Sequence, residues 1–240
     1  MEPSRRVNVE RLVERQLSSW KTRAKARESR GAAPAPEQVE ETMGPFVSVS
    51  REVGSGGNEL AAILARRLGY SLYDREIVDY IAERANVRAA AVKSLGETWY
   101  NATHNWISGV IDRRFLGCDE YVRHLIEVVG AIASHGPAVF VGRGVAFILP
   151  SRRGLRVRVV APFEQRVSYA VDRWNMSDSE ARKLILTSDA SQHGFIKAYY
   201  KADTCDPLIH DVTLNMDQVS LEVAADVCVA MLKARGLAPG

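Results

Sequence analysis

The stretch Phe46–Tyr73, which reads FVSVSREVGSGGNELAAILARRLGYSLY, decides the fold. It opens with an apolar, β-branched run at Phe46–Ser50, continues through a glycine-rich turn and ends in a helical pattern from Glu59 to Leu68. This order is typical of a phosphate cradle, because glycines let consecutive backbone N–H groups converge and a helix N-terminus carries a partial positive charge. The stretch therefore predicts a polyphosphate nucleotide as the ligand.

The glycine loop supplies the candidate nucleotide-binding residues, which are Gly54, Ser55, Gly56, Gly57 and Asn58. A Walker A loop ends in Lys followed by Ser or Thr, and Gly57 and Asn58 stand in those places. Positive charge must then come from elsewhere, and Arg51, just before the loop, is the nearest candidate. Two alternatives stay open. The loop can be a tight strand–helix turn without a ligand, and Arg51 can pair with Glu52 at the surface.

Composition places the chain among ordinary globular proteins. It has 240 residues, of which 46% are hydrophobic and 25% charged, enough for one large domain and an appendage. No apolar run approaches the roughly 20 residues that span a bilayer, and the first residues contain no apolar signal segment. The three cysteines are far apart, with no disulfide pattern and no metal-ligand spacing. We expect a cytoplasmic protein with reduced thiols, no membrane partner and no metal site of its own.

The charge distribution disfavours a dedicated nucleic-acid-binding domain. The net charge is +3, and residues 1–43 hold 9 Lys/Arg and 7 Asp/Glu, which leaves 23 and 22 for residues 44–240. A nearly neutral main body lacks the basic surplus of such domains. The excess of positive charge lies at the N-terminus, in a predicted exposed helix at Val7–Arg30 with a narrow apolar stripe. A linker at Gly31–Glu41 separates this helix from the main domain.

The main domain, residues 44–240, alternates between short apolar runs and longer amphipathic ones. The predicted strands are Phe46–Ser50, Ser71–Tyr73, Ala138–Gly142, Leu155–Val160 and Asp211–Asn215. The predicted helices are Glu59–Leu68, Arg75–Ala85, Glu120–Ser134, Phe163–Arg173, Ser177–Ser188 and Val219–Arg235. This alternation predicts an α/β fold with a parallel sheet and helices on both faces.

Ligands of such sheets bind beyond the carboxyl ends of the strands, and two further candidates lie there. Asp74 follows the second strand, where it can cap a helix or accept a hydrogen bond from a nucleoside. Arg143 follows the third strand between two glycines, and its planar fork suits a phosphate. Both residues are therefore candidates for binding a ligand, and for Asp74 the capping role stays open beside it.

Basic residues are frequent after position 150. Arg152, Arg153, Arg156 and Arg158 surround the fourth strand, and we expect them to mark an exposed strand end. Arg166 and Arg173 are seven residues apart and share a helix face, and Arg182 follows on the next helix. Most such charges form a solvated face, and one or two can project into a phosphate site. The five scattered histidines read as structural or surface residues.

Four segments together resemble the cytidylate kinase-like family, a branch of the P-loop nucleoside monophosphate kinases. They are VSVSREVGSGGNELAAILARRLGYSLYDREIV, VFVGRGVAFIL, LRVRVVAPFEQRV and ADTCDPLIHDVTLN, in the family's order. The resemblance implies a three-layer P-loop kinase-like fold with a five-stranded parallel core. It also implies an acceptor-binding helical insertion at Val87–Tyr121 and a mobile lid at Trp174–Asp206.

The activity implied by the resemblance is ATP-dependent phosphoryl transfer, with Mg²⁺, to a nucleoside monophosphate, CMP or dCMP. Nucleotides would be the partners of the site, and the N-terminal helix is a candidate for a protein contact or self-association. Positioning and electrostatics carry most of this catalysis, so no nucleophilic side chain is required. The residues expected to neutralise the transferred charge are Arg166, Arg173, Arg182, Lys197 and Lys201.

Two positions depart from the family pattern. The residue after the loop is usually basic and here is Asn58; the lid's Asp-x-x-Arg pair here reads Asp189 and Gln192. Lys197 and Lys201, further along, are candidates to substitute for the missing arginine. An alternative function follows: a regulatory module that binds a nucleotide and has weakened turnover.

Overall fold

A computed structural model describes residues 3–28, 38–115 and 117–238. Most of the expected linker at Gly31–Glu41 lies outside these residues. The chain forms two compact units, which are described separately. The first comprises Met1–Pro45, Tyr73–Ala138 and Ile148–Arg153, and the second comprises Phe46–Leu72, Val139–Phe147 and Gly154–Gly240.

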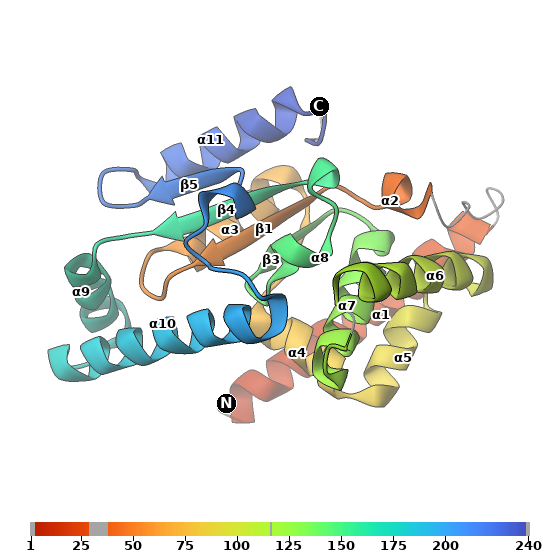
Figure 1. Ribbon diagram of the computed structural model, residues 1–240, viewed down its shortest axis with the longest axis horizontal. Helices are drawn as coiled ribbons and strands as arrows, with labels where there is room; N and C mark the ends of the chain where they lie inside the picture. The colour runs from red at the N-terminus through yellow and green to blue at the C-terminus, as the bar shows by residue number, and fades with distance from the viewer. Residues whose placement is uncertain (1–2, 29–37, 116, 239–240) are drawn as a thin grey trace. The chain divides into compact units, whose positions relative to one another are not determined.

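The sheet confirms the predicted fold class. Its five parallel strands are arranged in the order β2-β3-β1-β4-β5. They are β1 (Phe46–Arg51), β2 (Ser71–Tyr73), β3 (Ala138–Val141), β4 (Gly154–Val160) and β5 (Val212–Asn215). In Figure 1 the arrowheads of β1, β4 and β5 point the same way, so their carboxyl ends share one edge. The apolar runs of the sequence thus located every strand to within two residues.

Helices of the second unit cover the sheet and form the segment after β4. They are α3 (Gly57–Leu68), α9 (Phe163–Trp174), α10 (Asp178–Tyr200) and α11 (Leu221–Ala234), and the short α8 (Val145–Ile148) follows β3. Apolar faces of α3 and α11 pack on the buried strands in one core, to which Val49, Leu64 and Cys228 contribute. A smaller core joins α9 to α10. The helix α10 is longer than the predicted Ser177–Ser188 and carries most of the expected lid.

The first unit is helical. It contains α1 (Pro3–Glu28), α2 (Val39–Thr42), α4 (Arg75–Glu83), α5 (Ala85–Lys93), α6 (Glu97–Arg114), α7 (Glu120–His135) and the 3₁₀ turn η2 (Ser151–Arg153). The expected insertion, Val87–Tyr121, corresponds to α6 and parts of its neighbours. Within the described residues, no helix is long and apolar enough to cross a membrane.

The N-terminal helix is not the exposed appendage that the sequence predicts. The side chains of Val9, Val13 and Trp20 are buried where α1 packs against α4 and α5. Trp20 is 1% exposed, and its ring stacks on that of His135 with 4.5 Å between centroids. The narrow apolar stripe is therefore covered within the first unit, because helices with complementary apolar faces lie beside it.

Candidate functional site

The glycine loop between β1 and α3 has the backbone geometry of an anion cradle. Gly54 and Gly56 have φ values of 82° and 81°, a region that side chains with a Cβ rarely adopt. A Cβ on Gly54 would lie 2.8 Å from the carbonyl oxygen of Arg166, and one on Gly57 would lie 2.4 Å from Cβ of Arg51. No described side chain caps the N-terminus of α3, so its first N–H groups point toward the space above the loop.

The side chains of the loop form hydrogen bonds with the loop's own backbone and with the strands beside it. The hydroxyl of Ser55 donates to the carbonyl oxygens of Glu52 and Val159, at 2.8 and 3.3 Å, and its side chain is buried. Arg51 Nε donates to the amide oxygen of Asn58 at 2.9 Å. The backbone N–H of Ser55 also donates to the Glu52 carbonyl, at 3.2 Å, so Ser55 fixes the loop on β4 through both its side chain and its backbone.

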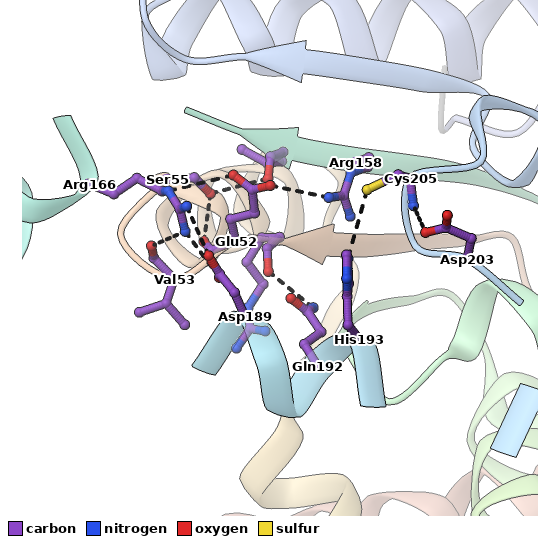
Figure 2. A network of polar contacts seen from close by, with 12 residues as sticks. Glu52, Val53, Ser55, Arg158, Arg166, Asp189, Gln192, His193, Asp203 and Cys205 are labelled. Carbon is purple, nitrogen blue, oxygen red and sulfur yellow. Dashed lines mark hydrogen bonds and ion pairs between the residues drawn. The ribbon is translucent and has the colours of Figure 1, made fainter. Parts of the chain in front are cut away.

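Two buried arginines lie beside the loop, and Glu52 stands between them (Figure 2). Arg158 Nη2 is 3.2 Å from Glu52 Oε1, and Arg166 Nε is 3.6 Å from Glu52 Oε2. Arg158 is 7% exposed and Arg166 6%, so the exposed strand end expected for Arg158 is wrong. Arg158 is buried because β4 is an inner strand of the sheet, and a buried guanidinium requires a carboxylate partner.

Arg166 connects the glycine loop to α10. Its guanidinium binds both oxygens of Asp189 on α10, at 3.1 and 2.9 Å, and also donates to the carbonyl of Val53 at 3.4 Å. Gln192, one turn along α10, donates to the carbonyl oxygen of Arg51 at 3.2 Å. The Asp-x-x-Gln pair of the sequence therefore faces the glycine loop directly.

Arg143 lies in a strained turn after β3. Its φ is 55°, between Gly142 at 77° and Gly144 at 66°, and such a left-handed non-glycine residue is uncommon. Tyr200 Oη donates to the carbonyl of Arg143 at 2.7 Å, and the guanidinium lies 5.1 Å from the ring centroid of Phe195. Strain maintained by surrounding contacts is typical of functional positions.

The turn after β3 and the end of β1 are adjacent. A Cβ on Gly142 would lie 3.7 Å from Nη1 of Arg51. The carboxyl ends of two neighbouring strands thus bring Arg51 and the turn of Arg143 to the same edge of the sheet, as predicted.

Arg182 and Lys201 have partners on α9 and α10. Arg182 forms a two-pronged pair with Glu164 and a second pair with Asp178, and these hydrogen bonds raise the pKa of Arg182 above its usual value. Lys201 caps α10 by donating to the Ala198 carbonyl at 2.9 Å. Arg173 and Lys197 are exposed.

Asp74 belongs to the first unit, where its carboxylate accepts the N–H of Ile77 at 2.9 Å and caps α4. This is the capping role that the sequence left open beside a role in binding.

A cavity of about 460 Å³ opens beside the loop at the carboxyl ends of β4 and β5. Its lining includes Glu52, Arg158, Cys205, His210 and Asn215. Burial, and next the positive charge of Arg158, lowers the pKa of His210 to about 4, so the imidazole is neutral at pH 7. Sequence reasoning missed Glu52 and His210 as residues of this region, because their partners lie far away in the chain.

The sequence matches the profile of the cytidylate kinase-like family over residues 46–218. The chain therefore belongs to this family, which confirms the resemblance and supports a kinase-like phosphotransferase as the general class of activity. The match includes the loop, both buried arginines, the turn of Arg143 and α10. No curated protein sequence matches the chain.

Several solved structures are similar to this chain at low sequence identity. An uncharacterized protein from Eubacterium ventriosum is 15% identical with a TM-score of 0.57, and the match covers 79% of this chain and 99% of that one. Shikimate kinase from Bacteroides thetaiotaomicron is 12% identical (TM-score 0.41; 79% and 98% covered). Shikimate kinase from Acinetobacter baumannii, in complex with shikimate, is 17% identical (TM-score 0.42; 84% and 99% covered).

Proposed function

We propose that this protein transfers the terminal phosphoryl group of ATP to a nucleoside monophosphate, CMP or dCMP. The observation that supports the proposal best is the glycine loop, with two positive-φ glycines at the start of a 12-residue helix and the buried Arg166 against it. Such a loop binds a polyphosphate through backbone amides and needs no lysine if arginines supply the charge.

The donor would bind at Gly54–Asn58, with its terminal phosphates on the backbone amides at the start of α3. Arg166 is the residue best placed to neutralise charge there, because its guanidinium already contacts the loop carbonyl of Val53. In the structure Glu52 and Asp189 balance that charge. An incoming polyphosphate would compete with these carboxylates for the same donors, so Arg166 can exchange partners without leaving its buried position.

Mg²⁺ would accompany ATP. The oxygen-bearing side chains at the loop, Asn58 and Glu52, suit a hard cation that prefers oxygen ligands. Bound to the donor phosphates, the ion would neutralise part of their charge.

The acceptor phosphate would bind Arg143. Its strained turn fixes the backbone, and its fork can donate two parallel hydrogen bonds to a phosphate. Asp74 would accept a hydrogen bond from the acceptor nucleoside in addition to capping α4.

An acceptor assay tests this assignment. Phosphate transfer from ATP is measured for CMP, dCMP, UMP, AMP and GMP with the wild type and with Arg143→Lys. Lysine keeps the charge and loses the fork, so KM for the acceptor should rise at least about tenfold while KM for ATP changes little. Arg66→Lys, which changes an exposed arginine in the last turn of α3, is the matched control and should leave both KM values unchanged. Normal acceptor KM in Arg143→Lys would overturn the role of this residue.

A second function is favoured by one observation. Gln192 occupies the position of the family's lid arginine and donates from a neutral amide to a backbone carbonyl. A protein that binds ATP at the loop and transfers no phosphate to any acceptor would be a nucleotide-binding regulatory module instead.

A further inference from the structure

The chain reverses after α10 and brings together three side chains of types that can bind a metal ion, His193, Asp203 and Cys205. Lys201 ends the helix with φ at 53°, a left-handed conformation that reverses the chain. The segment that follows runs back to α10 and places Cys205 beside His193 (Figure 2). The sequence predicts no metal site here, because the ligands come from opposite sides of this reversal.

The donor atoms are spaced as ligands of one ion. One nitrogen, one sulfur and one oxygen, from His193, Cys205 and Asp203, all lie within 4.8 Å of one another. The distance between Cys205 Sγ and His193 Nε2 is 3.8 Å. Zinc bonds of about 2.3 Å to sulfur and about 2.05 Å to nitrogen, at a tetrahedral angle, place these two atoms about 3.6 Å apart. Both can therefore bind one zinc ion with little movement.

A backbone hydrogen bond orients the third ligand. The N–H of Cys205 donates to Asp203 Oδ1 at 2.9 Å, which holds the carboxylate beside Cys205. Hydrogen bonds of this kind support the ligands of metal sites. All three side chains are exposed, so an ion has a route of entry and solvent can supply a fourth ligand.

We propose that His193, Asp203 and Cys205 form a zinc site that fastens the segment after α10 to that helix. A sulfur, a nitrogen and an oxygen suit Zn²⁺ rather than Mg²⁺, which prefers oxygen alone. The ion therefore differs from the one expected with ATP.

The site lies between two parts of the functional region. His193 directly follows Gln192, which holds the start of the glycine loop, and Cys205 lines the cavity next to Glu52 and Arg158. Zinc would fix both α10 and this wall of the cavity. The proposal does not depend on phosphoryl transfer, because it is tested by metal binding alone.

The test is metal titration of the full chain, purified without a histidine tag. Zn²⁺ is titrated in competition with a coloured chelator, and Co²⁺ is titrated while its absorption is recorded. The wild type should bind one ion per chain and show a thiolate-to-cobalt charge-transfer band. Loss of an outer-shell partner alone weakens metal binding about 10–100-fold, so Cys205→Ser and His193→Gln should weaken it at least as much.

Matched controls are Cys118→Ser and His104→Gln, which change a cysteine and an exposed histidine in the first unit. Both should bind Zn²⁺ like the wild type. Asp203→Asn retains the hydrogen-bond acceptor for Cys205 and loses the charge, so it should weaken binding and preserve the cobalt band. Zinc should also raise the melting temperature of the wild type and of both controls, and not that of Cys205→Ser. Equal Zn²⁺ affinity of Cys205→Ser and wild type, or a wild-type cobalt complex without a thiolate band, would overturn the proposal.

Discussion

The guanidinium of Arg166 and the carboxylate of Asp189 form a two-pronged ion pair, with N–O distances of 2.9 and 3.1 Å. The pair joins α9 to α10 at the glycine loop, and Arg166 is 6% exposed. A second arginine pair, between Arg182 and Glu164, joins the same helices and is exposed. Both pairs hold α9 against α10, but only Arg166 also contacts the glycine loop. Comparing variants of the two arginines therefore distinguishes a role at the loop from a role in helix packing.

This contrast gives the first prediction. Arg166→Lys retains a positive charge for Asp189 and Glu52 but loses the planar fork, so kcat should fall about 10³-fold, the lower end of the effect of a transition-state arginine. Affinity for ATP should change by less than about tenfold. Arg182→Lys should leave kcat unchanged. Both variants are compared with the wild type by steady-state kinetics and by melting temperature. Equal losses of kcat in the two variants would mean that Arg166 acts only through helix packing.

A second prediction concerns Gln192. A guanidinium offers a charged fork to the transferring phosphoryl group where the amide offers a weak donor, so Gln192→Arg should raise kcat with little effect on nucleotide affinity. If Lys197 or Lys201 already fills this role, Gln192→Arg should have no effect, and alanine at that lysine should abolish activity. A wild-type rate typical of monophosphate kinases, retained in both lysine variants, would contradict both branches.

The third prediction follows from His210. Its pKa is about 4 in the folded chain and about 6.5 in the unfolded chain. Between these values the unfolded state binds the proton, so stability is greatest above pH 6.5 and falls as the pH drops toward 4. When the pH is lowered from 7 to 5, the free energy of unfolding of the wild type should fall by up to about 2 kcal/mol more than that of His210→Gln. Urea unfolding measures this difference, and His104→Gln is the control. Parallel pH profiles of the wild type and His210→Gln would refute it.

The fourth prediction concerns the N-terminal helix. Trp20 is buried and stacks on His135, so Trp20→Ala should reduce the free energy of unfolding by about 3–5 kcal/mol. Leu12 on the same helix is 44% exposed, and Leu12→Ala should cost less than about 1 kcal/mol. Chemical denaturation of both variants measures the difference. A negligible effect of Trp20→Ala would restore the exposed N-terminal helix that the sequence predicts.

The sequence predicts the sheet well, because strands buried on both faces must be apolar runs. Val47, Val139 and Val157 belong to such runs, and each strand lies where its run predicts. The glycine loop is equally readable, because its positive φ values require glycine at Gly54 and Gly56.

Other features depend on contacts between residues far apart in the sequence, which a local pattern does not identify. Glu52 faces Arg158, which is 106 residues away, and a charged residue after a strand reads as an ordinary surface residue. The length of α10 is hidden because the polar run Ser191–His193 and Gly194 interrupt its apolar pattern before Phe195 and Ile196 resume it. A stripe such as that of α1 shows that a helix has an apolar face, but not which helices cover it.

The most direct test of the proposed function is transfer of the γ-phosphate of ATP to CMP, measured side by side for the wild type, Gly56→Val and Gly69→Val. Both glycines have positive φ, at 81° and 67°, and lie at opposite ends of α3. A branched Cβ is strained at either position, but only Gly56 belongs to the cradle. The account predicts CMP phosphorylation by the wild type and by Gly69→Val, and loss of both ATP binding and transfer in Gly56→Val. Transfer in Gly56→Val at the rate of Gly69→Val would contradict it.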